Sequence, residues 1–354
     1  MRDRGSSSTA REGPLNEPIP DARRLTAILN KYRTPSVRRS LFQLLTTAVL
    51  FALAWGLALL VIRVGWWASL LVAVPAGGLV IRLFIIQHDC GHGAFFPSRI
   101  ANDLVGFALG ILTLMPYGYW RRTHAIHHKT SGDLDYRGFG DISTLTVREY
   151  VARSWLGRLG YRVYRNPVVL LVLGPLYQFV IKHRLPLDIP WSWKQEWTSV
   201  LLTNIAIMSL IAIACLTVGW KTFLMVQLPI TLIAGSIGVF LFYVQHQFED
   251  TYWREHPEWD FHAAGLQGSS LLALPKVLQW FTANIGFHHI HHVNASIPNY
   301  RLPECYEKEP VFQHVTRITL RDGIKCLQLS LWDEERQKLV SFRQARKALN
   351  ATAR

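Results

Sequence analysis

The chain has 354 residues, half of them hydrophobic, and a formal net charge of +14. Long apolar runs alternate with strongly basic stretches, which excludes an ordinary soluble enzyme and indicates a membrane protein. The basic residues flank the apolar runs instead of gathering on a polar domain, so we expect contact with anionic lipid head groups and no nucleic-acid partner.

The first forty residues are polar and contain no apolar core of a signal peptide. Residues 1–40 are therefore predicted to form a cytoplasmic N-terminal tail. Residues 333–354 are predicted to form a basic C-terminal tail. No two cysteines form a C-x-x-C pair, so we expect free thiols at all four positions, which are Cys90, Cys215, Cys305 and Cys326.

Four segments contain the roughly 20 mostly apolar residues that a membrane-spanning helix needs. Their short connections pair them into two helical hairpins within one membrane domain, residues 41–332. The segments are residues 41–64, 66–87, 198–218 and 222–245.

Two shorter apolar runs, residues 104–115 and 168–181, fall between the hairpins. Both are too short to span, so they are expected to be re-entrant or to lie at the membrane interface. They could wall an acyl pocket or simply pack against the bundle.

Arginine and lysine are abundant in the N-terminal segment and in the loop between the hairpins, whereas the two tight turns have only Arg63 nearby and Lys221. The positive-inside bias therefore predicts that the tail, the middle loop and the C-terminal region share the cytoplasmic side.

Most of the fourteen histidines gather in three clusters, HDCGH at 88–92, HAIHH at 124–128 and HHIHH at 288–292, and one more ends the last span. Residues three or four apart share a helix face, so a helical cluster can aim several imidazoles at one point. The predicted topology brings all four pieces together beneath the membrane surface. The candidate metal ligands are His88, His92, His124, His127, His128, His246, His288, His291 and His292.

Nine imidazoles exceed the ligands of one tetrahedral zinc and fit two metal ions with open positions. Imidazole binds Fe, Zn, Cu or Ni, so the spacing alone does not name the metal. Carboxylates are expected to orient the rings, and the candidates are Asp89, Glu249 and Asp250, with Asp133 or Asp135 as further possibilities. The histidines left without a role are His183, His256, His262, His289 and His314.

At these residues the chain resembles the membrane fatty-acid desaturase family, whose signature is one H-x(3-4)-H box followed by two H-x(2-3)-H-H boxes. The surrounding stretches WRRTHAIHHKTSGDLDYRGFGD, YVQHQFEDTYW and LPKVLQWFTANIGFHHIHH are similar to bacterial and cyanobacterial acyl-lipid desaturases of the omega-6 (delta-12) and delta-5 groups. The resemblance implies an all-α integral membrane fold, with four transmembrane helices in two hairpins and a cytoplasmic helical cap that holds a di-iron site.

The resemblance also implies that the nine histidines bind two iron ions, with His246 as the extra ligand after the last span. One position departs from the pattern. Animal acyl-CoA desaturases place an asparagine one helical turn before that histidine as a water-mediated ligand, and here Phe242 occupies the position. Asn284 is the candidate substitute.

The implied activity is an O2-dependent desaturation that introduces a cis double bond into a membrane-lipid acyl chain, at the cytoplasmic side of a bacterial plasma membrane. The sequence has no H-P-G-G cytochrome b5 signature and no C-x-x-C motif, so a separate electron donor such as a ferredoxin is expected. Alternatives are a fatty-acyl hydroxylase or another membrane di-iron oxygenase on the same scaffold. A metal-ion transporter is a remote alternative, because the predicted spans are largely apolar.

Overall fold

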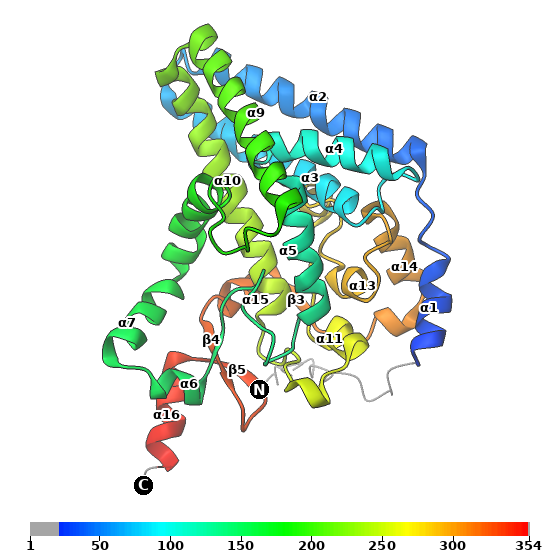
Figure 1. The fold of residues 1–354 in the computed structure, drawn as a ribbon, viewed down its shortest axis with the longest axis vertical. Coiled ribbons are helices and arrows are strands. Elements are labelled where there is room, and N and C mark those ends of the chain that lie inside the picture. Colours follow the sequence, from blue (N-terminus) through cyan, green and yellow to red (C-terminus); the bar gives the residue numbers. More distant parts are fainter. Residues whose placement is uncertain (1–20, 353–354) are drawn as a thin grey trace, which may run out of the picture.

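A computed structural model describes residues 21–352. Within this part of the chain, four helices are long and apolar enough to cross a membrane, which confirms the predicted fold class. They form two hairpins whose tight turns lie together at the upper left of Figure 1. The helices are α2 (Val37–Val61), α3 (Trp66–Gly91), α9 (Lys194–Val218) and α10 (Trp220–His246).

The central helix of the bundle is α3, which packs against both α2 and α10. In its most apolar stretch 67% of the residues are buried inside the protein, against 11–28% in the other three helices. The other three helices therefore direct most of their apolar surface outward, as lipid-facing helices do.

Two pairs of shorter helices make sharp bends between the hairpins. The first pair, α4 (Arg99–Leu112) and α5 (Tyr117–Thr130), bends by 103°. The second pair bends by 63° between α7 (Trp155–Tyr164) and the helical stretch Val169–Lys182, which comprises the π-helices η1 (Val169–Leu173) and η2 (Tyr177–Lys182) on either side of α8 (Gly174–Leu176). Both bent pairs have the form of either a broken span or a re-entrant segment, so the re-entrant or interfacial placement of the two shorter apolar runs stays a prediction.

The elbow between α4 and α5 is fixed by buried polar contacts. Leu114 has a left-handed backbone conformation, with φ of 57°. The side chain of Gln87, the residue before the first histidine cluster, donates to the Met115 carbonyl at 3.2 Å and accepts from the Thr113 hydroxyl at 2.6 Å. These contacts link the end of α3 to the elbow that precedes α5, the helix that carries the second cluster.

Short elements form a cap at the end of the bundle away from the tight turns (Figure 1). The helical elements are α6 (Val147–Ala152), η3 (His256–Glu258), α11 (Phe261–Gln267), α12 (Lys276–Phe281), α13 (His288–Val293), η4 (Asn299–Arg301), α14 (Leu302–Lys308), η5 (Pro310–Phe312) and α15 (Leu320–Cys326).

Among residues 21–352 the cap also contains five short strands that the all-helical prediction lacked. Strands β1 (Leu145–Thr146), β4 (Leu329–Asp333) and β5 (Lys338–Ser341) form one sheet in the order β1-β4-β5, with β1 parallel and β5 antiparallel to β4. Strands β2 (Leu271–Ala273) and β3 (Arg317–Thr319) form a parallel pair.

Both predicted tails need correction. Residues 1–20 and 353–354 lie outside the described residues, but Ala22–Asn30 forms helix α1, and α2 begins at Val37. Leu25 and Leu29, one helical turn apart, are buried in a cluster with Ile290 of the third histidine box. At the other end, β5 completes the sheet and α16 (Phe342–Thr352) buries Ala345. Each segment is amphipathic and packs on the cap, so neither is a simple polar tail.

Candidate metal centre

The three histidine boxes lie at or beside helix ends that meet where the bundle joins the cap. His88 lies in the last turn of α3 and His92 is its C-cap residue. The second box forms the end of α5, and the third box makes up most of α13. His246 is the last residue of α10. The structure therefore brings together all nine histidines that the sequence singled out.

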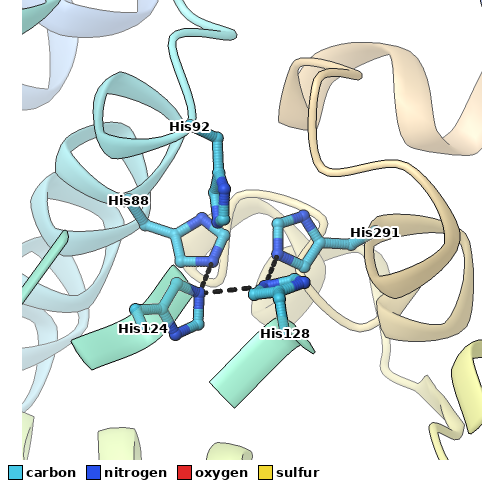
Figure 2. A group of neighbouring side chains, drawn as sticks. All are labelled: His88, His92, His124, His128 and His291. Atoms are coloured by element: carbon cyan, nitrogen blue, oxygen red, sulfur yellow. Dashed lines mark hydrogen bonds between the residues drawn. The ribbon is translucent and has the colours of Figure 1, made fainter. Parts of the chain in front are cut away.

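The nine rings separate into two groups. The five-histidine group comprises His88, His92, His124, His128 and His291, and Figure 2 shows how these five rings point toward one another. The four-histidine group comprises His127, His246, His288 and His292. Within each group, one ring nitrogen from every histidine lies within 4.8 Å of all the others.

Helical spacing explains how one box serves both groups. Neighbouring residues on a helix point about 100° apart, whereas residues four apart lie on one face. In the second box His124 and His128 join the five-histidine group, and His127 joins the other. In the third box the assignment is reversed. His288 and His292, four residues apart, join the four-histidine group, and His291 joins the five-histidine group. The doubled histidines thus divide their side chains between two sites.

The inward-facing nitrogen atoms fit a metal ion. In the five-histidine group, Nε2 of His124 lies 3.0 Å from Nε2 of His88 and 3.1 Å from Nε2 of His128, which in turn lies 3.0 Å from Nε2 of His291. Two nitrogens bound at right angles to one ion, each about 2.1 Å from it, would be about 3.0 Å apart. The observed spacing is therefore that of ligands around a shared cation.

The four-histidine group shows the same crowding. Nε2 of His246 lies 3.0 Å from Nε2 of His288. The Nε2 atoms of His127 and His292, and that of His92 in the other group, are buried without a hydrogen-bond partner. A buried lone pair without a partner is costly in free energy, and a metal ion would satisfy it.

Hydrogen bonds on the outward side orient two rings of the four-histidine group. The Nδ1 atom of His127 contacts the Asp141 carboxylate, and Nδ1–H of His246 donates to the Gly268 carbonyl at 3.2 Å. Such partners place the proton on Nδ1, leave the Nε2 lone pair free for a metal and raise its basicity. For these two rings the structure therefore supplies the outer hydrogen-bond partner expected of a histidine that binds a metal.

Asp141 was missed in the sequence, although one signal was present. Gly140 before it has φ of 79°, and a Cβ at this position would lie 3.0 Å from the Thr123 carbonyl oxygen and 3.3 Å from Cβ of His127. Glycine is therefore required for the Asp141 loop to approach α5 so closely. The glycine marks the close approach, but the sequence alone does not say what the loop approaches.

The predictions of Glu249 and Asp250 as orienting carboxylates are wrong. The chain leaves the helical conformation at Gln247, and both side chains turn to the surface. There the ammonium group of Lys338 lies 3.9 Å from Glu249 and 2.8 Å from Asp250. Closeness to His246 in the sequence did not translate into closeness in space.

Asp89 does lie beside the site, but its main partner is not a histidine. One carboxylate oxygen accepts hydrogen bonds from the backbone and side-chain amides of Asn299 at 2.7 and 2.8 Å. The other oxygen is 3.5 Å from Nδ1 of His88. Asp89 therefore connects the first box to the segment that follows the third box.

Asp133 and Asp135, the two remaining candidates for orienting carboxylates, contact His256 and none of the nine clustered histidines. Asp133 contacts Nδ1 of His256 at 2.7 Å, and Asp135 accepts a hydrogen bond from the His256 backbone N–H at 2.9 Å.

His289 is buried and donates Nε2–H to the Phe312 carbonyl at 3.1 Å, so it supports the cap from outside both groups. His183, His256, His262 and His314 also lie outside the two groups.

The position of the missing asparagine ligand is filled by an aromatic ring. The centroid of Phe242 lies 5.1 Å from that of His127 and 5.4 Å from that of His246. Asn284 does not replace the asparagine, because its amide group donates to the Asn299 carbonyl and accepts from the Gln279 side chain.

Burial favours the metal-binding form of the third box. The pKa values of His288, His291 and His292 lie well below the ordinary value of histidine. The main cause is desolvation by burial, and the second is the charge of neighbouring imidazoles. Each ring is therefore neutral near pH 7, and the neutral ring is the form that binds a metal.

The fold and the site define a four-helix membrane protein with two polyhistidine groups, one fully buried and the other partly buried. The sequence model of the family described as "Fatty acid desaturase" matches residues 65–317. A protein of Bacillus subtilis (strain 168) named "Fatty acid desaturase" is 45% identical over 321 residues, 91% of each chain.

Cyanobacterial relatives extend the similarity. The "sn-1 oleoyl-lipid 12-desaturase" of Synechocystis sp. (strain ATCC 27184 / PCC 6803 / Kazusa) is 25% identical over 68% of each chain. The "sn-1 acyl-lipid omega-3 desaturase (ferredoxin)" of Nostoc sp. (strain 36) is 24% identical over 77% of this chain and 75% of its own. The chain belongs to the fatty acid desaturase family and is an oxidoreductase.

Proposed function

We propose that this protein is an O2-dependent fatty-acyl desaturase that introduces a cis double bond into an acyl chain of a membrane lipid. The observation that carries the proposal is the pairing of two converging histidine groups at the end of a membrane bundle. The printed names of the cyanobacterial relatives, which specify acyl-lipid substrates, support lipid-bound chains as the substrate class.

The nine histidines would hold two iron ions, one in each group. A methylene C–H bond has no useful acidity, so acid–base residues cannot break it; a histidine-bound iron pair, supplied with O2 and two electrons, provides a sufficiently strong oxidant. The chain's own contribution is to hold the ligands in place. Asp141 and the Gly268 carbonyl fix the rings of His127 and His246, and burial keeps bulk water away from the site.

The electron donor would be a separate protein such as a ferredoxin, as the name of the Nostoc relative indicates for that enzyme. The net charge of +14 would steer an acidic donor toward the protein. The positive-inside bias supports a plasma-membrane location with the metal centre on the cytoplasmic side, because the cap lies at the ends of the bundle opposite the two tight turns.

Expression in a host that makes no polyunsaturated lipids tests the reaction. Mass spectrometry of derivatised lipid acyl chains should reveal a new double bond at one position, and infrared or chromatographic comparison should show that it is cis. The His128→Asn variant is the matched control and should give the fatty acids of the empty host. A hydroxylated product without a new double bond would replace this function with hydroxylation. Unchanged fatty acids together with metal uptake into vesicles would favour the transporter.

A further inference from the structure

Arg165 is a buried cation that the proposed chemistry does not use. It follows α7 as its C-cap residue, and only 2% of its surface is exposed. Among the described residues it forms no ion pair with a carboxylate. Burying an ion without a counter-charge costs several kcal/mol, so a hydrophobic residue would fill this place at a lower cost. The arginine therefore needs an explanation beyond packing.

Two segments meet at the guanidinium group. From one side, Nη1 donates to the Ser143 carbonyl at 3.0 Å and to the Thr144 hydroxyl at 3.2 Å. From the other side, Nη2 donates to the side chains of Tyr243 and Gln247, both at 2.9 Å. A third anchor is the Leu329 carbonyl of β4, also 2.9 Å from Nη2.

Both segments contain a residue that is part of the four-histidine group or contacts it. Ser143 lies two residues after Asp141, whose carboxylate contacts His127. Gln247 directly follows His246, and Tyr243 precedes that histidine by three residues. The Thr144 hydroxyl also donates to Gln247 at 3.2 Å, so the two segments are joined to each other as well as to Arg165.

The Asp141 segment depends on such anchors because it has little regular structure. Between the end of α5 and β1, residues 131–144 contain no helix and only an isolated bridge at Asp133. Its backbone has no ladder of its own to fix the carboxylate. The end of α10 has the same need, because the helix stops at His246 and the chain turns away at Gln247.

We propose that Arg165 is a positioning residue for the four-histidine group: its five hydrogen bonds hold the Asp141 loop and the end of α10 in register, and so place His127 and His246 around one metal ion. The inference rests on the proposed pair of metal ions. Ser143 and Thr144 lie two and three residues from Asp141 but at least fifteen residues from His128, the nearest member of the five-histidine group along that segment, so we expect the effect to be selective for one ion of the two.

The test is the metal content of full-length variants purified in detergent, stripped of metal and reloaded with 57Fe(II) without oxygen. Wild-type protein should bind two ions with two Mössbauer components, since the two ligand sets differ. Arg165→Met, which keeps much of the volume and removes the hydrogen bonds, should lose at least tenfold in affinity for one ion and weaken one component. Arg165→Lys should recover part of the loss.

Arg82→Met is the matched control. Arg82 is also buried and has no carboxylate partner within the described part of the chain, but it donates to Thr47 and to the Trp280 carbonyl and stacks on the Trp280 ring, away from His127 and His246. This variant should keep the four-histidine component. Two fully occupied components in Arg165→Met, or an equal loss of both, would overturn the proposal.

A second variant covers the case in which Arg165→Met does not fold. Gln247→Met removes one acceptor of the guanidinium and should show the same selective loss to a smaller extent. Equal loss of both ions, or unfolding as its only effect, would assign Arg165 a purely structural role and overturn the proposal. Wild-type protein that binds fewer than two ions would instead contradict the proposed function, before any variant is compared.

Discussion

The two histidine groups share two box helices, α5 and α13, but are held in place differently. Four of the five rings in the five-histidine group come from two pairs spaced four residues apart at the ends of α3 and α5. The four-histidine group has only one such pair, in α13, and draws its other two rings from α5 and from the end of α10. It therefore relies on partners from distant segments, namely Asp141 and Gly268.

A polyhistidine centre can thus combine a site that local helical spacing encodes with one that depends on tertiary contacts. The five-histidine site follows once three helices form and meet. The four-histidine site also needs a loop and a helix end to be placed correctly. We therefore expect the second site to be the more sensitive of the two to changes outside the histidines.

The largest effect is expected from the adjacent residues His127 and His128, which belong to different groups. His127→Asn and His128→Asn should each abolish desaturation, because each removes a ligand from one ion of a pair that must act together. The iron bound per chain should fall toward one in both variants, but the surviving Mössbauer component should differ. If the same Mössbauer component survives in both variants, His127 and His128 do not belong to different metal sites.

Metal removal should destabilise the folded protein, because each group crowds imidazole nitrogens whose lone pairs a metal ion would satisfy. Binding of one ion at free metal 100 times its Kd contributes about 2.7 kcal/mol to stability. The melting temperature in detergent should therefore fall on chelation and recover on adding Fe(II). If chelation removes the iron without changing the melting temperature, metal binding does not stabilise the folded protein, and this prediction is wrong.

A smaller and selective effect is expected from Asp141→Asn, which keeps the shape of the side chain and removes its charge. Loss of a carboxylate that orients a ligand typically lowers metal affinity about 10–100-fold. The loss should be confined to the four-histidine group, which a titration with Fe(II) would resolve as one weakened site. Asp250→Asn is the control, because Asp250 faces Lys338 at the surface, and it should match the wild type. Equal behaviour of the two variants would remove Asp141 from the site.

The smallest effect on metal binding is expected from Leu25→Ala in α1. Leu25 is fully buried in the cluster that contains Ile290, so truncation should cost about 2–5 kcal/mol of stability. Below the melting transition, iron binding should remain close to normal in both groups. The exposed neighbour Arg23 provides the control, Arg23→Ala, with no comparable loss. If Leu25→Ala has the melting temperature of the wild type, helix α1 does not stabilise the cap, and the prediction of a tail without a packing role would hold for this segment.

The histidine clusters and the four spans could be predicted because both depend on local patterns. Spacings of three and four residues determine which rings share a helix face, and about 20 apolar residues determine a span. What the spacing did not reveal is that His127 and His128 serve different sites, since that depends on where the other helices lie.

The remaining features depend on contacts between distant segments. Asp141 reaches His127 only because the loop packs on α5, and Glu249 misses the site because α10 ends at His246. The short strands pair segments far apart in the chain, as in the register of Leu145 with Leu331. Helix α1 was hidden by its polar composition, although its two buried leucines have helical spacing.

The presence of two separate iron sites is tested most directly by an anomalous difference map of the iron-loaded protein, recorded above the iron absorption edge. The division of the nine histidines predicts two separate iron peaks, one enclosed by the five-histidine group and the other by the four-histidine group. A single peak shared by both groups, peaks elsewhere in the protein, or a signal that appears only at the zinc edge would contradict the account.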